Sequence, residues 1–514
     1  MKNKTKRILS AFLAIITLLS TCMVVGCSND DENADGETQP TVSTEDNINL
    51  PQTRVPDDLR FDGQQVNILV RASHETEFDT EVTGNVIDNA IYTRNAETEE
   101  RLGIDIHYEV NSKPYHSEYL SHIRTVISSG IPTYDMVATD PYYGAALATE
   151  GLYYNLYNES EKNYVNPKLG WYNQSFVDEI TYSDYLPFIV GDVSMSSIDS
   201  SVVTYFNENL LMTYGIDVDL FDVVESGEWT LEYLKGLVKD VYADVDGIDG
   251  ETDKDTYGLY FNRGSMCIDA MIVAMGIRVT ERNANGELSI AINKHRNVDA
   301  YKALYDFIYE TSGVRNVGHS NGGKDGSLYD GQYCKYYSED RFFEGRSMFT
   351  FGMLSAAKVF STDPELMYGI LPLPKYDKDQ AQYSTCPQDS YSIIAIPFNI
   401  DTRLEIATAT LEILSQRSYV NVRPAFYDIA FKIRYASGEN TAKLFDSIID
   451  NITYNFGSVY SHSLKDPVWE MRNRLAGLTS QPISNLSTIT NQYNVVFKTK
   501  LTALLDIIEE NKVQ

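Results

Sequence analysis

Cysteine, basic residues and long apolar runs are scarce in this sequence of 514 residues, and each shortage excludes a class of protein. The 5 cysteines include no CxxC pair, and three of them, Cys267, Cys334 and Cys386, are widely spaced along the body of the chain. A disulfide scaffold or a zinc site is therefore not expected. Lys and Arg number 42 against 73 Asp and Glu, a formal charge of −31. This balance excludes nucleic acid as a partner and disfavours adsorption to an anionic membrane surface.

Catalytic motifs are also missing. The sequence contains no Walker A motif, no G-x-S-x-G elbow and no H-E-x-x-H, and its 7 histidines are isolated from one another. We therefore expect no enzymatic activity. One enzymatic alternative stays open: a glycan hydrolase needs two carboxylates at a separation that only the fold sets, and a chain with 73 acids always supplies pairs.

The N-terminus has the three parts of a signal peptide over residues 1–27. A basic start is followed by an apolar run from Ile8 to Leu19 and by Val24-Val25-Gly26 before Cys27. The pattern resembles a bacterial lipobox, which implies cleavage before Cys27 and acylation of this residue with palmitate-like chains; a transmembrane helix is the alternative. Acids dominate residues 28–58, which have almost no large apolar side chains, so we expect a disordered tether there.

The body alternates strands with helices. Val66, Ile68 and Val70 predict a strand, residues 86–102 carry a helical apolar face that ends at Gly103, and residues 104–110 return to period two. A helix over 115–128 and a strand over 134–139 follow. This order predicts an α/β fold with a doubly wound sheet, in which ligands bind beyond the carboxyl ends of the strands. The loops at 71–74 and 140–144 lie at such ends.

Further helices are predicted in the second half of the chain. Thr230 is a good N-cap, and Thr402 with Glu405 has the spacing of a capping box. Apolar spacing also predicts helices near Tyr301–Ile308 and Phe497–Ile508.

The order of several segments resembles that of a known family, the extracellular solute-binding proteins of ABC importers of the carbohydrate type, to which maltose-binding protein belongs. The segments that carry the resemblance are YDMVATDPYYGAALATEGLYYNL, VVTYFNENLLMTYGI, EWTLEYLKGLVKDV, DTYGLYFN, FFEGRSMFTFG and YGILPLPKY. Together they span about residues 62–420. The chain after residue 420 carries little motif information.

The resemblance implies two α/β lobes that close on a ligand by hinge motion. The lobes expected are 59–195 with 388–417 and 196–387 with 418–514. The implied function is a lipid-anchored receptor that captures a sugar or oligosaccharide and delivers it to the permease subunits of an ABC transporter. It would be a monomer on the outer face of the bacterial cell membrane, or in the periplasm of a two-membrane envelope. A surface lipoprotein that senses or adheres without transport is the alternative.

Candidate ligand residues are aromatic and polar side chains in the implied cleft. The 37 tyrosines suit sugars, because a tyrosine offers both an apolar face and a hydroxyl. The candidates are Arg71, His74, Asp140, Tyr142, Tyr143, Trp171, Trp229, Phe351 and Asp389. In maltose-binding protein the segment that resembles GRSMFTFGML ends in Gly-Pro-Trp, whereas here Met353 and Leu354 follow Gly352, so this sugar contact does not carry over.

An acidic loop is the single candidate for a metal. Asp244, Asp246 and Asp255 have the spacing of positions 1, 3 and 12 of a calcium loop, and family members carry such a loop here. However, Ile248 and Asp249 occupy the positions where the loop needs a ligand and a glycine. We therefore expect a solvated acidic turn and no cofactor, with calcium as the alternative.

Overall fold

The computed structural model of the chain describes residues 51–113, 116–317, 333–427, 440–477, 482 and 484–512. The predicted signal peptide, with Cys27, and residues 28–50 of the predicted tether lie outside these residues. For residues 51–58 the expected disorder is wrong: Val55 is buried, and Arg101 Nη2 donates a hydrogen bond to the carbonyl of Pro56 at 2.7 Å. The buried side chain of Val55 and the hydrogen bond from Arg101 both attach this segment to the body.

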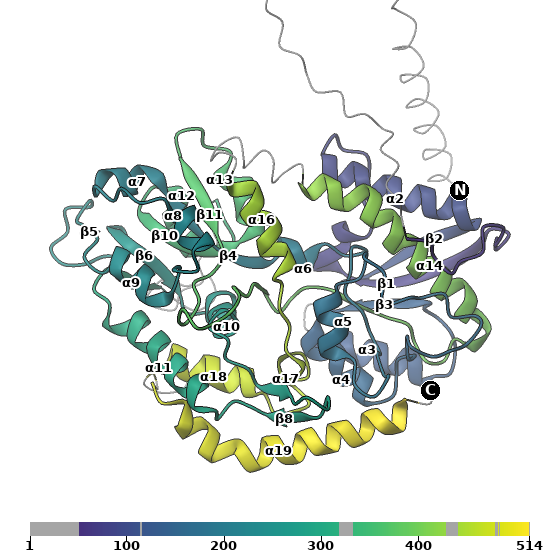
Figure 1. Ribbon diagram of the computed structural model, residues 1–514. Helices are drawn as coiled ribbons and strands as arrows, with labels where there is room; N and C mark the ends of the chain where they lie inside the picture. The colour runs from purple at the N-terminus through teal and green to yellow at the C-terminus, as the bar shows by residue number, and fades with distance from the viewer. Residues whose placement is uncertain are drawn as a thin grey trace, which may run out of the picture. The chain divides into compact units, whose positions relative to one another are not determined.

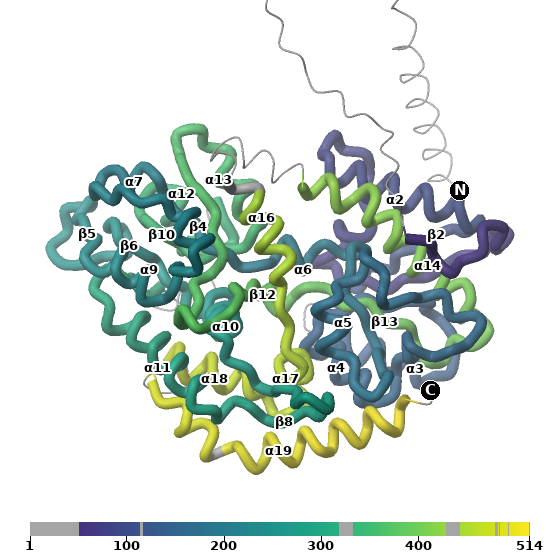
Figure 2. Tube along the Cα trace, in the orientation of Figure 1, coloured from purple at the N-terminus to yellow at the C-terminus, as the bar shows by residue number. Residues whose placement is uncertain are grey.

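The first lobe is built on a sheet with the order β13-β3-β1-β2 (β1, β2 and β3 are labelled in Figure 1, β13 in Figure 2). Its strands are β1 (Gln64–Arg71), β2 (Ile104–Asn111), β3 (Met136–Thr139) and β13 (Ile393–Ala395). β1 lies parallel to both β2 and β3, and β13 adds antiparallel to β3. The helices of this lobe are η1 (Ala72–Glu77), α2 (Val86–Leu102), α3 (His116–Ser128), α4 (Pro141–Thr149), α5 (Gln174–Ile180), η3 (Asp401–Arg403), α14 (Leu404–Arg417) and the π-helical turn η4 (Ser418–Val422).

The predicted helix–strand unit at the start of this lobe is confirmed. Asn85 caps α2 by accepting hydrogen bonds from the amides of Ile87 and Asp88, and Gly103 ends the helix in the left-handed region at φ 62°. β2 follows at once and pairs with the whole of β1. The predicted capping box at Thr402 is wrong, because residues 401–403 form the 3-10 turn η3 and α14 begins after it with no side-chain cap.

The second lobe contains a mixed sheet with the order β11-β4-β10-β6-β5, to which β12 adds on β4 and β9 on β6. Its strands are β4 (Ser201–Asn207), β5 (Tyr242–Ala243), β6 (Thr256–Asn262), β9 (Val314–Val317), β10 (Ser347–Met353), β11 (Tyr368–Leu371) and β12 (Cys386–Pro387), and β7 (Thr280–Arg282) pairs with β8 (Leu288–Ile290) in a separate hairpin. Its helices are α7 (Glu208–Thr213), α8 (Leu220–Glu225), α9 (Leu231–Val238), α10 (Ser265–Ala274), α11 (His295–Glu310), α12 (Tyr337–Phe343), η2 (Leu354–Ala356), α13 (Ala357–Phe360), α16 (Asn440–Asp450), α17 (Phe456–Val459), α18 (Pro467–Ala476) and α19 (Leu486–Asn511). The two sheets with flanking helices confirm the predicted α/β class.

The chain crosses between the sheets near α6 and β12 (Figure 2), in segments that are rich in serine. The first crossing runs through α6 (Ser196–Asp199) into β4, and the second runs from β12 to β13. The two crossings are hydrogen-bonded, since the amide of Gln388 donates to the carbonyl of Ser200 at 3.0 Å and the amide of Ser392 to Ser196 Oγ at 2.9 Å. At the third crossing, η4 still packs on α2 after the predicted boundary at residue 417. The exact lobe boundaries stay a prediction.

Further contacts join the lobes away from the crossings. Arg278, just before the β7–β8 hairpin, forms an ion pair with Glu179 of α5 at 2.8 Å, and Arg282 donates to the carbonyl of Glu179 at 2.8 Å. The long helix α19 packs on α11, α18 and β8, and its far end reaches α4 (Figure 1). There the side-chain amide of Asn155 donates from Nδ2 to the carbonyl of Lys512 at 3.2 Å. Among the described helices, none combines the length and the apolar character needed to cross a membrane.

Candidate functional site

A cavity of about 370 Å³ lies where the switch point of the first sheet faces helices α10 and α18. β1 is the central strand between β2 and β3, so the sheet reverses its winding next to β1, which is where doubly wound sheets bind ligands. The volume is within the usual range for small-ligand sites. The cavity is lined by Asp140, Tyr142, Tyr143, Asp269, Ile272, Val273, Gln388, Asp389, Tyr454, Asn455, Ser458, Ser461, Trp469, Arg472 and neighbouring residues.

Asp140 sets the geometry of the first wall. It follows the buried strand β3 and caps α4, with its Oδ1 accepting from the amide of Tyr143 at 2.9 Å and Pro141 in the first turn. Its Oδ2 lies 3.9 Å from Nη1 of Arg71, at the end of β1. Both groups are buried, and Arg71 does not line the cavity. The structure thus places the two predicted residues together, as a support for the α4 terminus.

Tyr142 and Tyr143 form the aromatic part of this wall. Their rings meet edge to face with centroids 4.8 Å apart. The hydroxyl of Tyr142 donates to Oδ1 of Asp466 at 2.5 Å and lies 3.2 Å from Nδ1 of His462, both from the segment between α17 and α18. Burial and the adjacent Asp466 raise the pKa of Tyr142 above its ordinary value. Tyr142 therefore joins the α4 wall to the opposite side of the cavity.

An arginine held by two carboxylates forms the opposite wall. Arg472 Nε donates to Oδ1 of Asp269 at 2.9 Å, and its Nη2 bonds both to the second oxygen of Asp269 and, at 3.2 Å, to Oδ2 of Asp389. α18 supplies Arg472, α10 supplies Asp269 and the second crossing supplies Asp389. Burial raises the pKa of Asp269 to about 6, although Arg472 opposes this shift. Of this trio, sequence reasoning found Asp389 alone.

Trp469, which the sequence reasoning also missed, is the one tryptophan on the cavity. Its side chain is 45% exposed, whereas Met471 and Leu475 of the same helix are buried. A tryptophan on the polar face of an amphipathic helix is the signal that could have found it. An exposed indole beside two tyrosines offers flat apolar surfaces of the kind that stack on sugar rings.

The other aromatic candidates lie in the core, so their prediction as cleft residues is wrong. Trp171 is 1% exposed and packs near Tyr419, and Trp229 is fully buried with its indole N–H donating to the carbonyl of Pro372 at 2.9 Å. Phe351 lies within β10, a central strand whose residues are all buried. Their large apolar surfaces fill the two lobes, which stabilises the fold more than exposure in a cleft would.

His74 lines a second hollow of about 530 Å³ together with Glu77, Lys335 and Lys358. Its Nε2 lies 3.8 Å from Oε1 of Glu77. Ser390 lines both hollows, so the second crossing separates them. His74 is therefore not brought together with Tyr142 and Asp389.

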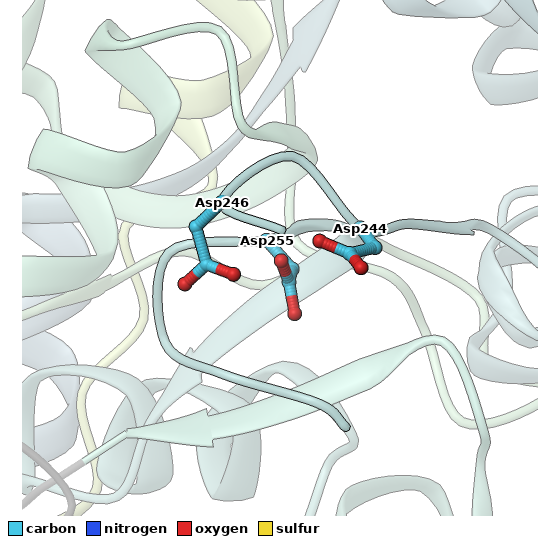
Figure 3. Close-up of side chains that lie close together, drawn as sticks. All are labelled: Asp244, Asp246 and Asp255. Atoms are coloured by element: carbon cyan, nitrogen blue, oxygen red, sulfur yellow. The ribbon is translucent and has the colours of Figure 1, made fainter. Parts of the chain in front are cut away.

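The acidic loop is well formed (Figure 3). One oxygen each from Asp244, Asp246 and Asp255 lies within 4.8 Å of the others. Each carboxylate already accepts a backbone hydrogen bond: Asp244 from Gly247 at 2.8 Å, Asp246 from Ile248 at 2.9 Å, and Asp255 from residue 252 at 2.8 Å. Burial alone would raise the pKa of Asp255, but hydrogen bonds from the backbone amides of Thr252 and Val245 and from the hydroxyls of Tyr242 and Thr252 outweigh it and lower the pKa. The backbone amides of the loop thus stabilise the negatively charged carboxylates, as a bound cation would.

Comparisons with known proteins place this fold among solute-binding proteins. No family model matches the sequence, and no curated protein matches it. Similar solved structures include the GacH receptor of Streptomyces glaucescens, studied without ligand and with acarbose, at a TM-score of 0.51 and 12% identity over 85% of this chain and 99% of that chain. MalE of Bdellovibrio bacteriovorus bound to maltotriose gives 0.51 and 13% over 85% and 100%.

UgpB of Mycobacterium tuberculosis, in complex with glycerophosphocholine, gives a TM-score of 0.53 and 13% identity over 85% of this chain and 99% of that chain. At such identities the likeness concerns the fold, and it extends over nearly the whole of each of these proteins. The resemblance read from the segment order is confirmed at this level: the chain has the two-lobed fold of the solute-binding proteins of ABC importers.

Proposed function

We propose that this protein is a receptor that binds a sugar or oligosaccharide between its lobes and delivers it to an ABC permease. The observation that carries the proposal is the cavity at the switch point, where Tyr142, Tyr143 and Trp469 surround polar side chains. Sugars present apolar C–H faces and hydroxyl rims, and this lining offers both aromatic faces and hydrogen-bond partners.

The lining draws on segments far apart in the chain, which suits a receptor that closes. α4 comes from the first lobe, α10 and α18 pack with the second, and Asp389 belongs to a crossing segment. A ligand that touches all of them stabilises the closed arrangement. The titles of similar structures name acarbose, maltotriose and glycerophosphocholine, so the ligand panel should include these chemistries.

Anchoring and delivery complete the proposal. Lipidation at Cys27 would hold the body outside the bacterial cell membrane, where the permease subunits take over the solute from a monomeric receptor. The carboxylates of the cavity favour binding over hydrolysis, because Asp269 and Asp389 are tied to Arg472 and Asp140 caps α4.

A thermal-shift screen tests the proposal. The full chain, purified in mild detergent, would be heated with maltotriose, cellotriose, raffinose, acarbose or glycerophosphocholine. A ligand at 100 times its Kd adds about 2.7 kcal/mol of stability, a shift of several degrees. Chromatography of the incubated sugar must show it intact, because conversion to smaller sugars would indicate a hydrolase. A cell that takes up the sugar normally without this protein would indicate a sensor or adhesin.

A further inference from the structure

The charge of the cavity is unbalanced. Among the described residues that line it, the acids are Asp140, Asp269 and Asp389, and Arg472 is the single Lys or Arg. The formal charge of the lining is therefore −2. Behind the lining, Asp466 accepts a hydrogen bond from the hydroxyl of Tyr142 and Arg71 lies 3.9 Å from Asp140, so the formal charge stays −2 when both are counted.

The arginine of the cavity is already held by two carboxylates. Its guanidinium is bound along one edge to both oxygens of Asp269 and bonds also to Asp389. A bidentate clamp on a ligand carboxylate or phosphate would need Nη2, which would first have to leave Asp269 or Asp389 and so unpair a carboxylate. Arg71 is buried behind Asp140, where its Nη2 donates to the carbonyl of Ser390 at 2.7 Å.

The aromatic residues of the cavity, like its carboxylates, favour a cation over an anion. The faces of Trp469, Tyr142 and Tyr143 carry negative charge density, which attracts cations and repels anions. A protonated amine in this cavity can therefore form an ion pair with a carboxylate and a cation–π contact with an adjacent aromatic ring. The side chain of Asp389 is 43% exposed, so a ligand group can reach it.

We propose that the cavity selects carbohydrates by charge, binding a sugar with a protonated amino group more tightly than its neutral counterpart and rejecting sugar acids and sugar phosphates. The proposal rests on the receptor function proposed above and names the ligand class of the same site. At contact distance one charge in a partly buried site changes affinity by about tenfold or more after desolvation is counted.

Tryptophan fluorescence tests the local charge without a known ligand. The sequence has 3 tryptophans, and Trp171 and Trp229 are buried, so a quencher in solution reaches Trp469 alone. In the full chain in mild detergent, caesium should quench more than iodide once both are normalised to neutral acrylamide. Asp389→Asn should move the ratio towards iodide, while Asp58→Asn, exposed near the opposite end of β1, should leave it unchanged. Trp469→Phe should abolish the quenching.

Binding of matched sugars tests the selection itself. Maltotriose and cellotriose would each be titrated calorimetrically as the neutral sugar, as the 6-amino-6-deoxy derivative and as the 6-carboxylate. For the scaffold that binds, the amine should bind about tenfold more tightly than the neutral sugar, and the carboxylate should bind weakest. Asp389→Asn should reduce the ratio of amine to carboxylate affinity about tenfold.

The outcomes separate the two proposals. A carboxylate that binds as tightly as the amine, or iodide that quenches as well as caesium, overturns the charge selection and leaves sugar reception standing. If no form of either scaffold binds and the wider panel is also silent, the receptor function fails, and the charge selection fails with it.

Discussion

Removal of the indole of Trp469 should weaken sugar binding more than any other single truncation in the cavity. The side chain is 45% exposed in the structure, so a stacked sugar can cover roughly 100 Å² of the ~250 Å² that a large aromatic residue offers. At about 25 cal/mol per Å², this burial contributes about 2.5 kcal/mol. The geometry of an aromatic contact adds about 0.5 to 1.5 kcal/mol. The alanine variant keeps a small part of the apolar contact with the sugar, so the measured loss is less than the sum. We expect Trp469→Ala to cost about 2 to 4 kcal/mol, or roughly 30-fold or more in Kd.

Calorimetry with the best oligosaccharide of the panel would measure this loss. Trp469→Phe keeps a flat ring and should lose less affinity than Trp469→Ala. Phe398→Ala is the matched control, because Phe398 is 39% exposed and does not line the cavity, so its affinity should equal that of the wild type. The reasoning is refuted if Trp469→Ala, with an unchanged circular dichroism spectrum, binds within threefold of the wild type.

Three further predictions concern stability, metal and membrane. Burial raises the pKa of Glu412 to about 7, although the hydrogen bonds that its carboxylate accepts from Tyr172 and from the backbone amide of Asn166 lower it. The folded state thus holds a proton that the unfolded state has lost between about pH 4.5 and 7, so stability should fall as pH rises through this window. Glu412→Gln should flatten this dependence and gain up to about 3 kcal/mol over the wild type at pH 8 in chemical denaturation; equal slopes would contradict the assignment. Chelation of calcium should leave the melting temperature unchanged, because backbone amides already satisfy the acidic loop; a calcium-dependent rise that Asp244→Ala removes would show a real site. Cys27→Ala should abolish incorporation of radiolabelled palmitate and leave uncleaved precursor, and labelling that persists would place the lipid on Cys22, the other cysteine of the predicted signal peptide.

Local patterns were enough to predict the first lobe and one wall of the cavity. Alternating apolar residues gave β1 and β2, and the glycine at 103 ended the helix between them, because these signals depend on neighbours in sequence. The rule for strand ends then brought Asp140, Tyr142 and Tyr143 to the site without further information.

The second wall could not be predicted in this way. Asp269, Trp469 and Arg472 line the same cavity only because α18 packs on α10, and no local sequence pattern in either helix predicts this contact. The prediction of Trp171 and Trp229 failed for a related reason: a scarce aromatic residue is as valuable to the core as to a cleft, and only tertiary packing decides between them.

The attachment of α19 at both ends bears on how fast the protein can exchange its ligand. This helix of 26 residues extends about 39 Å. Its body packs with the second lobe, while beyond its last turn Lys512 bonds to Asn155 and to Ser183 Oγ of the first, at 3.2 Å in each case. A lobe that swings away must either rotate about this end as a pivot or release these bonds. The terminal contacts would then slow the opening of the lobes. A chain shortened by its last few residues would bind and release ligand faster, and its ligand residence time would fall more than its fold stability.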